Sequence, residues 1–320
     1  MSVRTKLQRL TRLRRLAWLE ERIAATQLVV DRRIAEIEAR LTALDSRILC
    51  LEQDLQGVHK ALSVLSELRN TPLVPRSEFD LFKSSLEVPR AMVEEFQEWK
   101  ARNPIPDRPF VSVCIPTYNR SKLLTERSIP SVLRQTYNHL ELIVVGDGCT
   151  DETEESVARI EDPRLRFVNL PTRGVYPSDP LRRWMVAGTP AVNRALELAQ
   201  GDYITHLDDD DEYLPERLKK LVEFATSQAC DFVWHPFWWE DESGNWILSE
   251  CPEMVYAQVT TSSVFYRAWF KKIEWDANAH LLGEPGDWNR FRRIKYLNPV
   301  ARRFPEPLLR HYRERQQMQE

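Results

Sequence analysis

The sequence predicts an α/β domain, a mostly parallel sheet covered by helices on both faces, preceded by an α-helical coiled coil. A heptad repeat of apolar residues within 1–69 indicates the coiled coil. From residue 108 to 320, short apolar runs alternate with helical segments, which is typical of a parallel sheet. Five prolines interrupt the intervening residues 70–107, predicting a linker with one short helix at Ala91–Lys100.

The heptad seam is continuous over ten apolar residues. Its a positions are Ile34, Leu41, Ile48, Leu55 and Leu62, and its d positions are Ile37, Leu44, Leu51, Val58 and Leu65. A strict seven-residue repeat favours a left-handed supercoil with a partner helix, so we expect a homo-oligomer, with the number of chains open. The alternative is a long helix packed along its own domain.

The residues ahead of the seam form a basic amphipathic segment. Arginines and lysines between residues 4 and 15 alternate with leucines, and no acidic residue precedes Glu20. Such a helix can contact an anionic membrane surface, or it can simply continue the coil.

Composition restricts the function classes. The net charge of −3 gives no field suited to nucleic acid. The five cysteines form no C-x-x-C pair, which disfavours a zinc site or a disulfide framework and predicts a reducing compartment. The sequence contains neither an apolar run of about 18 residues nor a secretory signal. We therefore expect a cytoplasmic protein, with contact at the inner face of the membrane as an option.

The order of elements follows from the apolar pattern. We expect strands at Val111–Ile115, Leu140–Val145, Leu165–Leu170 and Asp202–Leu207, and helices at Leu123–Gln135, Asp151–Ile160, Trp184–Ala199 (interrupted near Gly188–Pro190) and Pro215–Ser227. A parallel sheet binds ligands beyond the carboxyl ends of its strands, so the loops after the first, second and fourth strands are the places for a site.

Four consecutive aspartates, Asp208–Asp211, follow the fourth strand directly. Adjacent carboxylates repel one another, and a hard divalent cation such as Mn²⁺ or Mg²⁺ relieves the repulsion while binding a substrate diphosphate. The alternative is an acidic surface turn that caps the helix after Pro215. The position of the cluster at a strand end favours the metal site.

Two further loops carry polar groups at strand ends. The loop after the first strand contains Pro116, Thr117, Tyr118, Asn119 and Arg120, and lacks the glycines of a dinucleotide or P-loop motif. After the second strand, Asp147 is placed to accept a hydrogen bond from a base N–H. Asp151 is better explained as a helix cap.

Together, these segments resemble glycosyltransferase family 2, which has the GT-A fold. The resemblance rests on V-S-V-C-I-P-T-Y-N-R at 111–120, L-I-V-V-G-D-G-C-T-D-E-T at 142–153 and G-D-Y-I-T-H-L-D-D-D-D-E-Y-L-P-E-R-L at 201–218. It covers roughly Arg108 to Tyr312 and none of the coiled coil.

The resemblance implies roles for the donor-side residues. Asp147 would read the nucleotide base, Asp208 would face the donor ribose or the metal, and Asp210 would ligate the metal, with Asp209 beside them. Asp211 matches a further frequent acidic position. The chain departs from the family at Gly146, where another Asp is common.

On the acceptor side, residues 283–291 look like the family's E-D-W segment. The resemblance implies that Asp287 is the base that deprotonates the acceptor hydroxyl, with Glu284 as the alternative and helix capping as the simpler role. His311 lies in a late segment that resembles one near the donor diphosphate and is a weaker metal candidate.

A tryptophan-rich segment and a group of arginines could belong to the site, but each also has an explanation that involves no ligand. The tryptophan-rich segment 231–246 reads as a hairpin with a glycine turn and would either line an acceptor groove or pack in the core. Arg173, Arg182 and Arg183 flank a proline-bearing loop that could close over the donor, although simple solvent exposure explains them.

The expected function is an inverting transfer of a hexose from a UDP- or dTDP-sugar to a hydroxyl of a glycan, lipid-linked or peptide acceptor, in cell-surface glycan synthesis. Alternatives are a metal-dependent nucleotidyltransferase and a non-catalytic coiled-coil scaffold with a degenerate sugar-nucleotide domain.

Overall fold

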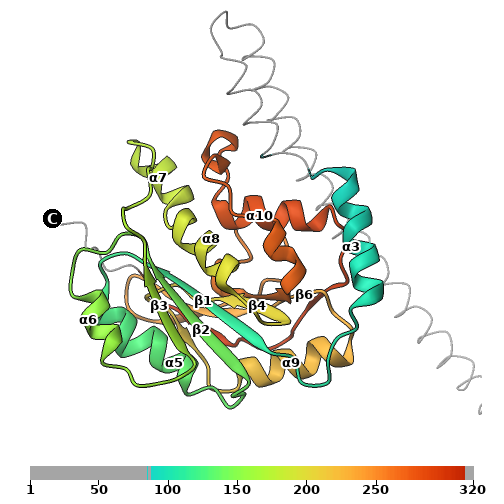
Figure 1. Cartoon of the computed structure of the whole chain (residues 1–320), viewed down its shortest axis with the longest axis horizontal. Coiled ribbons are helices and arrows are strands. Elements are labelled where there is room, and N and C mark those ends of the chain that lie inside the picture. The colour runs from blue at the N-terminus through green and yellow to red at the C-terminus, as the bar shows by residue number, and fades with distance from the viewer. Residues whose placement is uncertain (1–84, 86–87, 314–320) are drawn as a thin grey trace, which may run out of the picture. The chain divides into compact units, whose positions relative to one another are not determined.

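A seven-stranded sheet forms the centre of the structure, a computed structural model that describes residue 85 and residues 88–313 (Figure 1). The strand order is β10-β6-β9-β4-β1-β2-β3. Its pairings are parallel except those of β9, which runs antiparallel to β4 and β6. The strands are β1 (Val111–Thr117), β2 (Leu140–Gly146), β3 (Leu165–Asn169), β4 (Tyr203–His206), β6 (Phe232–Trp234), β9 (Val264–Arg267) and β10 (Ala301–Arg303).

Strand side chains alternate between two apolar cores, one on each face of the sheet. In β1, Val113 and Ile115 belong to one core and Cys114 to the other. In β2, Val144 and Val145 divide in the same way. This period of two, with both faces apolar, explains why these strands read as continuous hydrophobic runs.

Helices cover both faces, as predicted. Helices α5 and α9 contribute to the first core, whereas α3, α8 and α10 contribute to the second (Figure 1). The helices are α3 (Arg90–Arg102), α4 (Ser121–Leu123), α5 (Ile129–Leu133), α6 (Thr153–Ala158), α7 (Pro180–Val186), α8 (Thr189–Leu198), α9 (Arg217–Ser227) and α10 (Gly286–Lys295).

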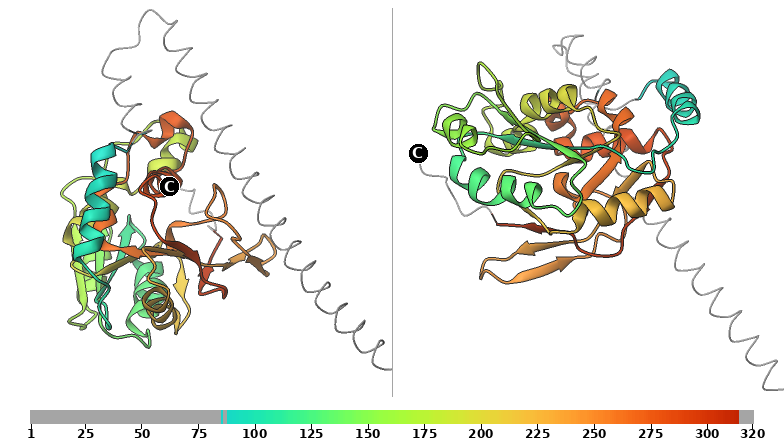
Figure 2. Two further views of the ribbon diagram at one scale, coloured as in Figure 1. Left: turned by 90° about the vertical axis from the view of Figure 1, so that its right-hand side faces the viewer. Right: turned by 60° about the horizontal axis from the view of Figure 1, so that its bottom comes forward.

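A second, four-stranded sheet has the order β5-β11-β7-β8. It consists of β5 (Glu212–Tyr213), β7 (Phe237–Glu240), β8 (Trp246–Ser249) and β11 (Leu309–His311). The predicted tryptophan-rich hairpin is therefore split: β6 joins the main sheet, while β7 and β8 form a hairpin that extends away from it (Figure 2, right). His235 and Pro236 separate β6 from β7 and allow the chain to change sheets.

The predicted helix Leu123–Gln135 is present but irregular. A π-helical turn, η1 (Leu124–Ser128), separates α4 from α5. Pro130 has no N–H to donate, and a wider turn just before it accommodates the missing hydrogen bond. The predicted interruption near Gly188–Pro190 is confirmed, since Gly188 adopts a left-handed φ of 77° between α7 and α8.

The predicted short helix within residues 70–107 corresponds to α3 and packs on the domain, with Phe96 fully buried. The expected coiled coil and the basic segment ahead of it lie outside the described residues. In the part of the chain that the structure describes, no helix combines the length and apolar character needed to cross a bilayer.

Candidate active site

Three of the predicted loops meet at the point where the strand order reverses. The chain runs outward from β1 through β2 to β3 and then returns to place β4 on the other side of β1. Ligands of open α/β sheets bind at such a switch point, beyond the carboxyl ends of the two central strands. Here these ends carry residues 116–120 on one side and the four aspartates on the other.

The loop after β1 is bonded directly to the acidic cluster. Pro116 and Thr117 end the strand, and the Thr117 hydroxyl donates to Asp209 Oδ2 at 2.7 Å. The Arg120 guanidinium Nη1 lies 3.1 Å from Asp209 Oδ1 and 2.6 Å from Asp210 Oδ2. The positive charge of the Arg120 side chain therefore partly balances the carboxylates of Asp209 and Asp210.

Three other groups converge as a candidate metal site. One potential ligand atom from each of Asp208, Asp211 and His311 lies within 4.8 Å of the other two. Asp211 is fully buried and accepts two hydrogen bonds, from His311 Nδ1 at 2.9 Å and from the Tyr312 backbone N–H at 3.1 Å. His311, on β11, thus meets the end of β4 although about a hundred residues separate them.

The electrostatics of the cluster favour a cation. Burial, reinforced by the charges of Asp211 and Asp210, raises the pKa of Asp208 well above its ordinary value. Burial and the same kind of repulsion raise the pKa of Asp210 to about 6. Burial opposes charge on His311, but the Asp211, Asp208 and Asp210 carboxylates outweigh it and raise its pKa to about 9.

The donor set fits a divalent ion. Two carboxylates and an imidazole are within the reach of one cation, which would relieve the repulsion that raises these pKa values. Metal binding requires the imidazole to lose its proton, so the affinity would increase with pH. A nitrogen ligand favours a transition ion such as Mn²⁺ over Mg²⁺, which prefers oxygen ligands.

Asp147 lies on the opposite side of the β1 loop and is almost fully buried. Its carboxylate accepts hydrogen bonds from the Gly174 N–H at 3.0 Å and from the Tyr176 hydroxyl. Segment 172–176 therefore covers Asp147, the residue predicted to read the nucleotide base. Arg173 stacks on the Tyr118 ring, with its guanidinium carbon 3.7 Å from the ring centroid.

Asn119 joins the first two loops rather than pointing into the cluster. Its Oδ1 accepts from the Thr150 N–H at 2.8 Å, and its Nδ2 donates to the Thr150 hydroxyl at 3.1 Å. Asn119 has a positive φ of 50°, which asparagine tolerates better than most residues. Gly146 faces the Asn169 amide, which occupies the space that a larger side chain would need.

The two acceptor-side candidates differ in their surroundings. Glu284 is held by Arg292, whose Nε and Nη2 lie 2.9 and 2.8 Å from its carboxylate oxygens. Asp287, in the first turn of α10, has no ion pair among the described residues. It accepts from the Trp288 N–H at 2.6 Å and keeps partial solvent access, and burial raises its pKa to about 6.

A short 3₁₀ turn, η2 (Thr261–Ser263), connects the two sides of the site. The Ser262 hydroxyl accepts from the Asp208 N–H at 2.9 Å, while the Thr261 hydroxyl lies 3.5 Å from Asp287 Oδ2. Sequence reasoning missed this link, since no motif marks residues 261–263. The sequence also did not single out Asp211 as a metal ligand, although Asp211 directly follows Asp210 in the acidic run.

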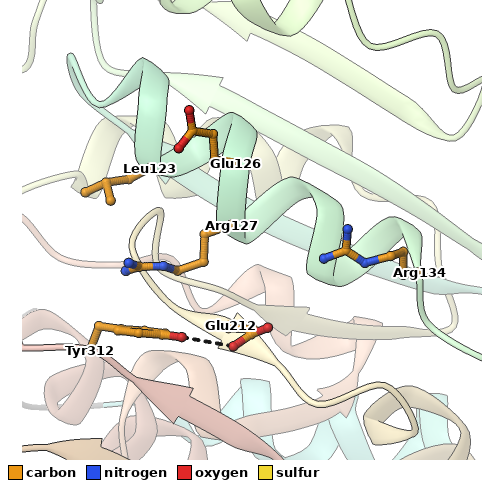
Figure 3. A pocket seen from close by; sticks show the side chains of 6 residues that line it. All are labelled: Leu123, Glu126, Arg127, Arg134, Glu212 and Tyr312. Carbon is orange, nitrogen blue, oxygen red and sulfur yellow. Dashed lines mark hydrogen bonds between the residues drawn. The ribbon is translucent and has the colours of Figure 1, made fainter. Parts of the chain in front are cut away.

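A cavity of about 300 Å³ adjoins the acidic cluster but does not contain it (Figure 3). Acidic and basic side chains both line the cavity. The Arg127 guanidinium carbon lies over the Tyr312 ring, 3.6 Å from its centroid. Arg127 also donates to the Asp210 carbonyl at 2.6 Å. The lining residues are Leu123, Glu126, Arg127, Arg134, Glu212 and Tyr312. None of the predicted site residues lines this cavity, although Arg127 links its wall to the backbone of the acidic cluster.

The comparison with known families decides the classification. Residues 112–178 and 183–274 match the model of glycosyl transferase family 2. The chain belongs to glycosyltransferase family 2. The matched segments include the β1 loop, Asp147 and all four aspartates, so the resemblance in these motifs is confirmed at the level of the family.

Curated family 2 relatives are similar over a shorter stretch. WcaA of Escherichia coli K12, which carries the name of a colanic acid biosynthesis glycosyl transferase, is 36% identical over 40% of this chain and 44% of its own. TuaG of Bacillus subtilis, named for teichuronic acid biosynthesis, is 35% identical over 39% of this chain and 45% of its own. This chain therefore spans less than half the length of each relative.

Among solved structures, Staphylococcus aureus TarS 1-349 aligns with a TM-score of 0.50 and 21% identity, over 63% of this chain and 60% of that one. This likeness agrees with the GT-A fold expected for a family 2 member.

Proposed function

We propose that this protein transfers a hexose from a UDP- or dTDP-sugar to an acceptor hydroxyl, with inversion at the anomeric carbon, during the synthesis of a cell-surface polysaccharide. The observation that carries the proposal is the convergence of Asp208, Asp211 and His311 at the switch point, linked through η2 to Asp287. A cation site and a candidate base thus lie on two sides of one turn.

Asp208, Asp211 and His311 would hold the divalent metal. When bound there, the cation would supply positive charge that neutralises the leaving nucleoside diphosphate. The sequence resemblance implied Asp210 in place of Asp211, and the ion pair of Asp210 with Arg120 is the reason for preferring Asp211. Arg120 keeps Asp209 and Asp210 oriented at the end of β4.

Asp287 would accept the proton of the acceptor hydroxyl. A carboxylate with a pKa of about 6 is ionised at neutral pH but is more basic than an ordinary aspartate, which suits a general base. Glu284 is less suited because Arg292 holds both of its oxygens. Asp147 and Tyr118 would contact the nucleoside once segment 172–176 makes room.

The names of the relatives support the acceptor class. Colanic and teichuronic acids are polysaccharides, and a Campylobacter jejuni relative, 33% identical over 37% of this chain, is named as a glucosyltransferase acting on an undecaprenol-linked saccharide. A saccharide, free or lipid-linked, is therefore the acceptor class that we propose.

Release of nucleoside diphosphate tests the proposal. We expect one UDP- or dTDP-sugar to turn over in the presence of Mn²⁺, and Asp211→Asn to lower that rate about a hundredfold by removing a metal ligand. Asp210→Asn separates the two ligand assignments: if it raises the Mn²⁺ concentration needed for half-maximal rate while Asp211→Asn does not, Asp210 is the ligand.

The matched control is Glu154→Gln, an exposed acidic residue in the first turn of α6. It changes the net charge by the same amount, so its rate should equal that of the unmodified protein. Absence of turnover with every donor would favour the non-catalytic scaffold. Turnover at equal rates in all variants would show that the acidic cluster does not hold the metal.

A further inference from the structure

Helix α7 and the loop before it expose an unusual group of side chains. Val175 is 96% exposed, Leu181 61% and Trp184 62%, and Arg182 and Arg183 between them are exposed as well. Single exposed apolar residues are common, but here Leu181 and Trp184 lie three residues apart on one helix and flank two exposed arginines. We call these five residues the α7 face.

The α7 face lies beside the acceptor side of the candidate site. A Cβ added at Gly286 would lie 3.3 Å from the Met185 carbonyl oxygen, so the last turn of α7 abuts the residue that precedes Asp287. Helix α7 also packs against the 3₁₀ turn η4 (Ala279–Leu282), which exposes a further apolar side chain, Leu281. In Figure 1, α7 lies at the upper left of the described domain.

The charge of the face is not neutralised by neighbouring acids. Across residues 88–313, no ion pair is formed by Arg182 or Arg183. Arg183 donates to the carbonyl oxygens of Pro177 and Ser178, while the nearby Asp179 uses its carboxylate to cap α7 through the Arg182 N–H. The face therefore presents positive charge together with apolar side chains.

This combination matches the surface of an anionic bilayer. Tryptophan favours the membrane interface, aliphatic side chains enter the acyl boundary, and arginines are attracted to anionic headgroups. A saccharide acceptor would account for Trp184, because sugars stack on aromatic rings, but it would leave the exposed Val175 and Leu181 unexplained. The family match is also interrupted between residues 178 and 183, where α7 begins.

We propose that the α7 face docks on an anionic phospholipid bilayer and turns the acceptor side of the protein, beside Asp287, toward the membrane. The α7 face is separate in sequence from the basic N-terminal segment, whose own contact with a membrane stays a prediction. The docking does not depend on the proposed reaction, because binding to lipid is measured without donor or acceptor.

Vesicle sedimentation with the full-length chain tests this docking. Vesicles of phosphatidylcholine alone are compared with vesicles that also contain phosphatidylglycerol. We expect the unmodified protein to prefer the anionic vesicles, and the double variant Leu181→Ser/Trp184→Ser to partition about tenfold less, as removal of two apolar side chains from an interface predicts.

The matched control is Trp246→Ser/Ile247→Ser on β8, where two side chains are 36% and 41% exposed. Both double variants retain the basic N-terminal segment, so their difference isolates the α7 face. Partition of the Leu181/Trp184 variant equal to that of the control would overturn the proposal, as would a lack of preference for anionic vesicles in the unmodified protein.

Fluorescence quenching by brominated phosphatidylglycerol provides a second readout. If Trp184 enters the interface, the vesicles quench the unmodified protein, and Trp184→Phe removes most of that quenching while retaining vesicle binding. Unchanged quenching in Trp184→Phe would show that another tryptophan enters the membrane and would contradict the proposal. A raised KM of the Leu181/Trp184 variant for a soluble saccharide, with vesicle binding intact, would assign the face to the acceptor instead.

Discussion

At the scale of single residues, the ionised Asp287 side chain lowers the stability of the folded protein. Burial raises its pKa from the ordinary value of 3.8 to about 6, so its ionised form is less stable in the folded chain than in water. No cation compensates for this cost among the described residues, unlike at Glu284, which is paired with Arg292. Such a carboxylate is typical of a residue retained for chemistry rather than for stability.

The raised pKa of Asp287 makes the stability of the folded protein depend on pH. The folded state holds the Asp287 proton up to a pH of about 6 and the unfolded state releases it near 4, so the contribution of this group to the free energy of unfolding decreases as pH rises between those values. Asp287→Asn should raise the free energy of unfolding by about 1–2 kcal/mol at pH 7.5 and by almost nothing at pH 4. Because the side chain is partly exposed, the expected gain in the free energy of unfolding is smaller than the full pKa shift would give. Urea unfolding at both pH values measures it.

The same substitution should remove catalysis. At saturating Mn²⁺, turnover of the unmodified protein should rise with pH through about 6 and then level, because the base must be ionised. Asp287→Asn should lower kcat by about a hundredfold or more while leaving the affinity for donor unchanged. As a control, Glu284→Gln should retain the same pH profile but lose stability, since it breaks the pair with Arg292. Similar turnover in Asp287→Asn and the unmodified protein would assign the base to another residue.

At the scale of elements, the turn between β2 and α6 lies against the segment that covers Asp147. Gly148 has a φ of 69°, and a Cβ there would lie 2.3 Å from the Arg173 backbone nitrogen. The glycine therefore meets two requirements, a left-handed backbone and close contact with the segment that covers Asp147.

Gly148→Ala should therefore destabilise the protein by about 2–3 kcal/mol, the sum of backbone strain and a forced shift of segment 172–174. Gly244→Ala is the matched control, because Gly244 has a φ of 81° but a Cβ there would meet only the Glu240 side chain, at 3.7 Å. The control should cost about 1 kcal/mol, from the backbone alone. Equal unfolding midpoints for the two variants would show that the contact with Arg173 is unimportant.

The strands and helices of the first half of the domain were predictable for a physical reason. Strands β1 and β2 have both faces buried, so they are continuously apolar and stand out from the amphipathic helices between them. The split of the tryptophan-rich segment into β6 and β7 was not predictable, because the change of sheet at His235 depends on pairing with β9 and β11, which are distant in sequence.

At the scale of the whole molecule, the assembly state remains a prediction from the heptad repeat, which lies outside the described residues. Leu44→Lys/Leu51→Lys places charges at two d positions of the seam and should dissociate the oligomer into monomers. Light scattering coupled to size exclusion measures the mass. Ser46→Lys/Gln53→Lys, at positions away from the seam, should leave the mass unchanged; dissociation by both pairs, or by neither, would contradict a coiled coil in this register.

The α/β class of the domain, the family and the loops of the candidate site could be read from the amino-acid sequence alone. These features depend on local patterns: apolar runs, strand-end aspartates and short motifs. Which side chains come together depends on the packing of distant segments. The tertiary structure brought His311 to Asp211 across about a hundred residues, paired Asp210 with Arg120 and joined Asp208 to Asp287 through η2. It also placed Arg217 and Arg290 fully inside the domain, against the rings of Tyr213 and Tyr266. Such contacts depend on how distant segments pack, and residue type and spacing along the chain do not encode those distances.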